Sequence, residues 1–130
     1  MKKNLDERVT FDQMIVNEYE RGQGINPHVD NCKLFGGTVV SLSLASEAVM
    51  VFEREHSKVE TSGEGDLREK PSKKVKADRI ATHEVRMKRR SLVILQGPAR
   101  YLWKHSIPAR LKDHGVERST RLSLTFRTII

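Results

Sequence analysis

The stretch at residues 38–53, TVVSLSLASEAVMVFE, decides what kind of fold this chain forms. In residues 38–44, β-branched and apolar side chains alternate with serine, a pattern typical of a strand with one buried face. Residues 48–53 have a similar apolar character, and the Ala-Ser-Glu between the two segments indicates a turn. We therefore expect two neighbouring strands here, in a fold built mainly from β-structure.

More short strands are predicted on both sides of this stretch, at residues 11–19, 91–96, 100–107 and 121–129. The segment RGQGINPHVD at 21–30 contains Gly22, Gly24 and Pro27, which favour a turn followed by a short extended segment. The chain has no evident internal repeat and no convincing long amphipathic helix. It is predicted to be one all-β or mainly β domain spanning residues 1–130.

Residues 55–83 differ in composition from the rest, because they are dense in charged residues, serine, glycine and proline. They offer little to a core, so we expect a mobile loop between two strands. The loop either carries substrate contacts or is a solvated insertion without a role. If it binds nucleic acid, the phosphate contacts are expected from four lysines close to Pro71, which are Lys70, Lys73, Lys74 and Lys76.

The formal net charge is +7, and it is unevenly distributed along the chain. Residues 1–53 carry 5 Lys or Arg and 8 Asp or Glu, whereas residues 54–130 carry 19 and 9. A basic region of this kind favours a polyanionic partner such as nucleic acid, because neutralising phosphates releases counterions. A solvated basic surface has the same composition, so charge alone leaves both interpretations open.

Composition also limits the environment of the protein. No stretch approaches the roughly 18 to 20 apolar residues that span a bilayer, and the N-terminal MKKNLDERVT lacks the apolar run of a secretory signal. The single cysteine, Cys32, excludes an internal disulfide. We therefore expect an intracellular protein without a membrane partner, and we treat it as a monomer. The sequence does not distinguish a cytoplasmic from a nuclear protein.

His28 and Asp30 form a His-x-Asp pair. At positions i and i+2 of an extended segment, both side chains point to the same face and can bind one divalent metal ion. A second histidine would complete the two-His, one-carboxylate triad that suits non-haem Fe(II) and leaves coordination positions open. A His-x-Asp pair on its own also occurs by chance in proteins that bind no metal.

The remaining histidines compete for the third ligand position, and these are His56, His83, His105 and His114. The first two bound the charged loop and the last lies in a polar turn, whereas His105 is in a predicted strand, which positions a ligand better. We therefore predict that His28, Asp30 and His105 hold the metal. The alternative is that His105 packs as a buried or edge histidine near Trp103.

The segment RLSLTFRT at 121–128 places its polar residues on one face of a strand and its apolar residues on the other. Arg121 and Arg127 share the polar face, roughly 20 Å apart at about 3.3 Å per residue. Leaning side chains could bracket a small dianion, because the guanidinium fork binds a carboxylate bidentately. Asn17 and Tyr19 share a face in the same way and could hydrogen-bond an oxo-acid. The competing interpretation is an edge strand with a solvated polar face.

The order of these motifs resembles the AlkB family of Fe(II)/2-oxoglutarate dioxygenases. The matching segments are NEYERGQGINPHVD, TVVSLSLASEAVMVF, RRSLVILQGPARYLWKHSIPAR and RLSLTFRTI. They cover most of residues 15–53 and 89–129, and their sequences most resemble the AlkB homologues that modify the wobble uridine of tRNA. The resemblance implies a double-stranded β-helix (jelly-roll) core.

The resemblance also implies roles for individual residues. Fe(II) would be bound by three side chains, those of His28, Asp30 and His105. The co-substrate 2-oxoglutarate would be held by Asn17, Tyr19, Arg121 and Arg127. Among these, Arg121 would pair with the distal carboxylate and Arg127 would line the pocket near the iron. Cys32 stands on the substrate side, where relatives often carry a polar or acidic group, and the N-terminal lid that grips a flipped nucleotide is expected to be largely absent.

The reaction implied by the resemblance couples oxidative decarboxylation of 2-oxoglutarate by O2 to hydroxylation of a C–H bond. Hydroxylation of an N-methyl group ends in release of formaldehyde, as in DNA repair, whereas a stable carbon keeps the hydroxyl, as in tRNA modification. We therefore expect an oxidoreductase that acts on a nucleic-acid base. The same chemistry on a protein or lipid is one alternative, and a non-catalytic nucleic-acid-binding module is another.

Overall fold

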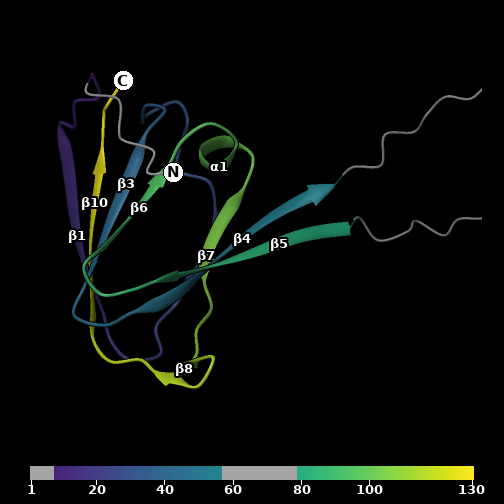
Figure 1. Cartoon of the computed structure of the whole chain (residues 1–130). Helices are drawn as coiled ribbons and strands as arrows, with labels where there is room; N and C mark the ends of the chain where they lie inside the picture. Colours follow the sequence, from purple (N-terminus) through teal and green to yellow (C-terminus); the bar gives the residue numbers. More distant parts are fainter. Residues whose placement is uncertain (1–7, 57–78) are drawn as a thin grey trace, which may run out of the picture.

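A computed structural model describes residues 8–56 and 79–130, and these form two four-stranded antiparallel sheets that face each other (Figure 1). The first sheet has the order β1 (Gln13–Tyr19), β10 (Arg121–Arg127), β3 (Val39–Leu44) and β6 (Ser91–Leu95). The second has the order β2 (Ile25–His28), β7 (Lys104–Ile107), β4 (Ala48–His56) and β5 (Arg79–Met87). The smaller elements are the helix α1 (Pro98–Tyr101) and a hairpin of β8 (Lys112–Asp113) and β9 (Val116–Glu117).

The chain crosses repeatedly from one sheet to the other, and this path is that of a jelly roll. β1, β3, β6 and β10 lie in the first sheet, while β2, β4, β5 and β7 lie in the second and β8 and β9 form a separate hairpin. The mainly β, jelly-roll prediction is therefore confirmed. Segments 38–44 and 48–53 are strands as predicted, but they are not sheet neighbours, because the turn between them passes from one sheet to the other. No helix in the described residues is long and apolar enough to cross a membrane.

The core between the sheets is apolar on the side of the second sheet and partly polar on the side of the first. Its buried apolar residues are Val39, Ala48, Met50, Phe52, Met87, Leu95 and Ile107. In the middle of the first sheet, the inward positions are instead Ser41, Ser43 and Ser123, and the hydroxyls of Ser41 and Ser123 lie 3.1 Å apart. Because serine is small, this part of the inner face leaves a hollow, where larger apolar side chains would fill the space.

Three predicted strands, at 11–19, 91–96 and 121–129, are confirmed with small changes of boundary. The first half of the segment at 100–107 was predicted wrongly, because α1 precedes β7 there. Pro98 has no N–H for a strand partner, and its fixed φ suits the first turn of a helix.

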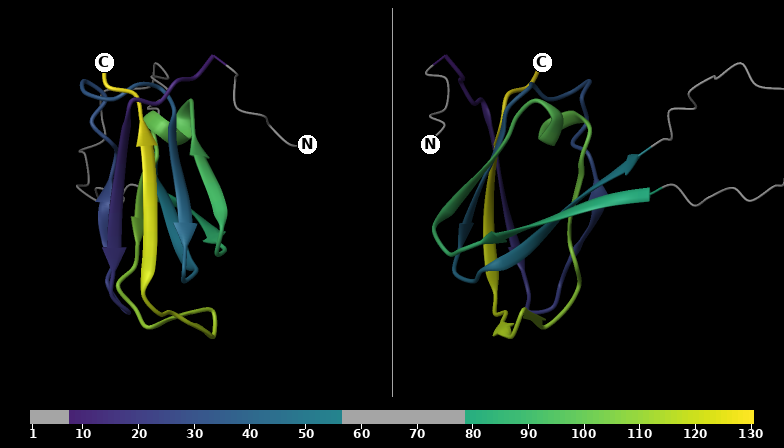
Figure 2. Two further views of the ribbon diagram at one scale, coloured as in Figure 1. Left: turned by 90° about the vertical axis from the view of Figure 1, so that its left-hand side faces the viewer. Right: turned by 45° about the vertical axis from the view of Figure 1, so that its right-hand side comes forward.

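The boundaries predicted for the charged loop, 55–83, were also wrong. β4 continues to His56 and β5 begins at Arg79, and the two strands extend together away from the rest of the molecule (Figure 2). Among the described strands, β5 pairs only with β4, so much of it faces solvent and its composition is polar. Residues 57–78, with Lys70, Lys73, Lys74 and Lys76, lie outside the described residues.

Gly24 allows the segment before β2 to lie against the segment after β7. A Cβ atom at this position would lie 2.3 Å from the carbonyl oxygen of Ile107 and 2.7 Å from the backbone nitrogen of Ala109. Only glycine permits an approach this close. The glycine predicted to belong to a turn therefore also sets the position of β2 beside β7.

A buried carboxylate connects the β8–β9 hairpin to the second sheet. Asp113 accepts hydrogen bonds from Arg118 at 2.6 and 2.8 Å, from Arg110 at 2.7 Å and from the backbone N–H of Val49 at 3.3 Å. Burial by itself raises the pKa of Asp113, but the hydrogen bonds from Arg118 and Arg110 lower it below its ordinary value. The carboxylate is thus the ionised centre of a structural cluster.

We expect Asp113→Ala to destabilise the protein strongly, because it leaves the buried guanidinium of Arg118 without its counter-ion. Removing one partner of a buried pair costs about 3–5 kcal/mol of unfolding free energy, which urea denaturation would measure. The matched control is Lys112→Ala on the same hairpin, whose ion pair with Glu117 is exposed and contributes about 1 kcal/mol or less. Equal losses in both variants would contradict this account.

Candidate active site

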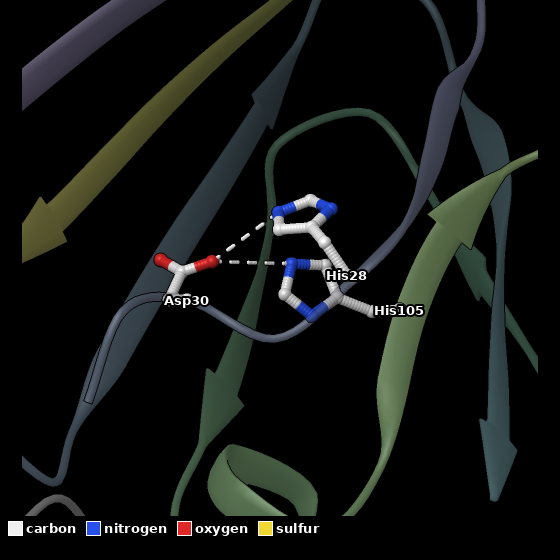
Figure 3. A group of neighbouring side chains, drawn as sticks. All are labelled: His28, Asp30 and His105. Atoms are coloured by element: carbon white, nitrogen blue, oxygen red, sulfur yellow. Dashed lines mark ion pairs between the residues drawn. The ribbon is translucent and has the colours of Figure 1, made fainter.

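His28 and His105 face each other because their strands pair in antiparallel fashion. The two residues are direct partners in the register of β2 and β7, which puts their side chains on one face at close range. Their ring centroids lie 4.3 Å apart. Asp30 follows His28 by two residues, and its Oδ1 lies 3.3 Å from Nε2 of His28 and 3.5 Å from Nε2 of His105 (Figure 3).

These three side chains form a group that fits a metal ion. Their ligand atoms all lie within 4.8 Å of one another. Neighbouring ligands about 2.1 Å from a metal, at right angles to each other, would be separated by roughly 3 Å, close to the two distances to Asp30. Two imidazoles and one carboxylate on one side of an ion suit Fe(II) and leave its other side open.

The surroundings of both histidines suit metal binding. Nδ1 of His28 lies 2.8 Å from the carbonyl oxygen of Asn26, and Nε2 is the ring nitrogen on the side of Asp30. Burial lowers the pKa of His105 from 6.5 to about 4, with the nearby His28 and Arg100 acting in the same direction and Asp30 opposing them. His105 is therefore neutral at pH 7 and available as a ligand.

The competing histidines that the structure describes lie elsewhere. His83 is on β5, where it is the register partner of Phe52, and His114 pairs with Glu84. The side chain of His56 is outside the described part. Within residues 8–56 and 79–130, no other group of three His, Cys, Asp or Glu side chains could hold a metal ion.

A cavity of about 200 Å³ extends from this group into the space between the sheets. It is lined by all the residues predicted to bind metal or co-substrate, which are Asn17, Tyr19, His28, Asp30, His105, Arg121 and Arg127. The serines of the first sheet and several core residues complete the wall. The volume is below the roughly 300–1,000 Å³ of a drug-sized site, and it suits a small molecule such as a dicarboxylic acid.

Arg121 is a buried cation in this cavity and forms no ion pair with another described residue. It is 4% exposed, and one nitrogen donates to the Ser43 hydroxyl at 2.9 Å. Its Nε and Nη1 are buried and find no partner in the described residues. Burial lowers the pKa of Arg121 below its ordinary value, and the ring of Tyr19 lies 5.5 Å from the guanidinium carbon. Free donors on a buried cation are the features expected of an anion site.

Arg127 lies at the opposite end of β10 from Arg121, close to the His-Asp-His group. Its Nη1 lies 3.2 Å from Oδ2 of Asp30, and its guanidinium stacks 4.0 Å from the ring of Phe35. It thus occupies one carboxylate oxygen of Asp30, while the other oxygen faces both histidines. The arginine that the sequence predicts to line the pocket also orients the carboxylate of the candidate metal group.

Two features of the site departed from the sequence-based expectations or were missed by them. Cys32 is exposed, and it is not among the residues that line the cavity, so its substrate-side role stays a prediction. Arg100 was not singled out, although it is 2% exposed and its guanidinium contacts the segment that carries Asp30. The sequence around Arg100 did not indicate these contacts, because the three acceptors are backbone carbonyls, which any residue has.

Comparison with known proteins identifies the class of this fold and site. The sequence matches the 2OG-Fe(II) oxygenase superfamily over residues 2–127, and the chain belongs to that superfamily. It is similar to an uncharacterized protein of Acanthamoeba polyphaga mimivirus, with 35% identity over 92% of this chain. It is also similar to the alkylated DNA repair protein ALKBH8 homolog of Arabidopsis thaliana, with 32% identity over 93% of this chain.

A third relative is the tRNA (carboxymethyluridine(34)-5-O)-methyltransferase alkbh8 of Xenopus tropicalis, which is 33% identical over 91% of this chain. These similarities confirm the resemblance to the AlkB family. The chain spans only part of each relative, covering 49%, 35% and 18% of their lengths in the order given.

The metal-free protein should lose stability as the pH falls from about 6.5 toward 4. In this range the unfolded chain protonates position 105 but the folded chain does not, so the unfolded state binds more protons and is favoured by acid. Urea denaturation at a series of pH values, with a chelator present, measures the slope. A His105→Asn variant should show a shallower slope, because it removes this group from the titration. Identical slopes for wild type and His105→Asn would contradict the lowered pKa.

Proposed function

We propose that this protein is a 2-oxoglutarate-dependent dioxygenase that oxidises a nucleic-acid base. The observation that carries the proposal is the pairing of two sites in one cavity. A His-Asp-His group suited to Fe(II) lies at one end, and a buried, unpaired arginine suited to a carboxylate lies farther along the same wall. Membership of the 2OG-Fe(II) oxygenase superfamily supports the same chemistry.

In the proposed reaction, Fe(II) would be held by His28, Asp30 and His105. When bound, the iron supplies the activation of O2 that couples decarboxylation of 2-oxoglutarate to oxidation of the substrate. Arg121 binds the distal carboxylate of 2-oxoglutarate through the donors that are otherwise unpaired. Asn17 and Tyr19, which are register partners of Ser123 and Arg121, line the cavity beside it and orient the co-substrate by hydrogen bonds.

The substrate class rests on two supports. The names of two relatives refer to alkylated DNA and to a tRNA uridine. The charge of this chain favours a polyanion, since the net charge is +7 and the excess of lysine and arginine lies in residues 54–130. A nucleic-acid base is therefore the substrate we propose, and a protein or a lipid is the alternative.

The function is tested by succinate release with Fe(II), 2-oxoglutarate and a panel of N-methylated DNA, N-methylated RNA and modified tRNA. We expect stimulation by one nucleic acid of this panel, with formaldehyde as a second product if an N-methyl group is removed. Asp30→Ala should abolish turnover, because it removes a metal ligand, and His114→Ala should retain it. Turnover stimulated only by peptides or lipids would overturn the substrate class, and nucleic-acid binding without any succinate would overturn the enzyme.

Arg121→Ala should weaken 2-oxoglutarate binding without abolishing metal binding. A charge-assisted hydrogen bond contributes about 1.5–3 kcal/mol, which corresponds to about ten- to a hundredfold in affinity. Arg121→Lys should recover only part of this, because lysine lacks the planar fork. Calorimetric titration of 2-oxoglutarate into the Mn(II)-loaded protein measures the effect, with Arg86→Ala, an exposed arginine outside the cavity, as the control. An unchanged affinity in Arg121→Ala would refute the role of Arg121.

A further inference from the structure

Arg100 is a buried cation with an unusual set of partners. It lies in α1, its side chain is 2% exposed, and in the described part of the chain it forms no ion pair. Its guanidinium donates to three backbone carbonyls instead: Nη1 to Asp30 at 2.8 Å, Nη2 to Phe35 at 3.1 Å and Nε to Gly36 at 3.0 Å. The ring of Tyr101 lies 4.8 Å from its guanidinium carbon.

All three acceptors belong to the segment at 30–36, which begins with the carboxylate of the candidate metal site. This segment follows the end of β2 and precedes β3, so no strand ladder holds Asp30. An isolated bridge from Phe35 to Ile129 and a turn closed by Asn31 are its other regular backbone contacts. Because burying a cation is costly unless its donors are satisfied, the carbonyls and Arg100 hold each other in place.

Arg100 also connects the two halves of the His-Asp-His group. It is five residues before His105, on the short helix that leads into β7, and it reaches the backbone of Asp30 on the other side. Arg127 fixes the Asp30 side chain through Oδ2. Asp30 is therefore held at its main chain by Arg100 and at its side chain by Arg127, which leaves Oδ1 directed at both histidines.

We propose that Arg100 is a positioning residue for the metal centre, which fixes the main chain of Asp30 relative to His105. This inference rests on the proposed function, since it assumes that the group binds a metal. Arg100 is not among the residues that line the cavity. Its effect should therefore appear in metal affinity, and not as a separate loss of 2-oxoglutarate binding once the metal is saturating.

The test compares Mn(II) binding, followed by calorimetry and by the Mn(II) electron paramagnetic resonance spectrum, in wild type, Arg100→Lys and Arg100→Gln. We expect a loss of about 10- to 100-fold in Mn(II) affinity, the usual effect of removing a group that orients metal ligands, with an altered spectrum of the bound ion. Lysine should rescue less than fully, because it cannot reach three carbonyls with a planar fork.

The matched control is Arg118→Lys, which alters another buried arginine whose partner is Asp113, at the β8–β9 hairpin. It should lower stability in urea by a similar amount and leave Mn(II) affinity unchanged. Equal affinity in wild type and folded Arg100→Lys would overturn the positioning role alone, whereas a wild type that binds no Mn(II) would overturn the proposed function. If neither Arg100 variant folds, the test is hydrogen exchange of the wild-type protein with and without Mn(II). We expect Mn(II) to protect the backbone amides of both residues 30–36 and α1. Protection of only one of these two segments would refute the coupling.

Discussion

The pairing of β2 with β7 is the constraint on which the candidate site depends. The two strands share only the register pairs Ile25 with Ile107 and His28 with His105, with an irregularity between them. A slip of one residue would turn His28 to the opposite face of the sheet and separate the imidazoles. The close approach at Gly24 prevents that slip, because it fixes where β2 begins relative to the backbone after β7. A residue without a side chain thus determines the geometry of the candidate metal ligands.

Strand β10 connects the two chemical functions of the cavity. Its inward positions run from Arg121, beside Tyr19, through small polar residues to Arg127, beside Asp30. The two arginines have opposite roles because their surroundings differ. Arg127 has a carboxylate partner and an aromatic ring, so it serves the architecture of the metal group. Arg121 contacts the Ser43 hydroxyl and the Met87 sulfur, and two of its nitrogens have no partner among the described residues, so it is the one suited to an incoming anion.

Much of the fold could be predicted from the sequence, because alternating polar and apolar residues are typical of strands with one buried face. The serine–leucine alternation in β3 and β10 is an example, since each serine faces the hollow and each leucine faces outward. β5 was missed for the opposite reason. It pairs on one side only and carries charged residues on its exposed face, so its pattern is like that of a polar loop.

The residue types of the candidate metal group could be predicted from the sequence, but the contacts between its residues could not. The spacing of His28 and Asp30 is local and is visible in the chain, whereas the pairing of His28 with His105 spans most of the sequence. The choice of His105 relied on its position in an expected strand. Arg100 could not be found in this way, because backbone carbonyls leave no residue-specific mark in a sequence. The buried pair of Asp113 and Arg118 could not be predicted either, because its burial depends on how the hairpin folds onto β4.

The unsatisfied nitrogens of Arg121 have a consequence for the lifetime of the protein in a cell. Part of the cost of burying that cation remains in the folded state until an anion arrives. A ligand that binds only the folded chain adds about 2.7 kcal/mol to stability at a hundredfold excess over its Kd. If 2-oxoglutarate is that ligand, the fraction of molecules open to proteolysis would fall as the acid accumulates. The amount of folded protein would then depend on the concentration of that acid, without any change in its synthesis.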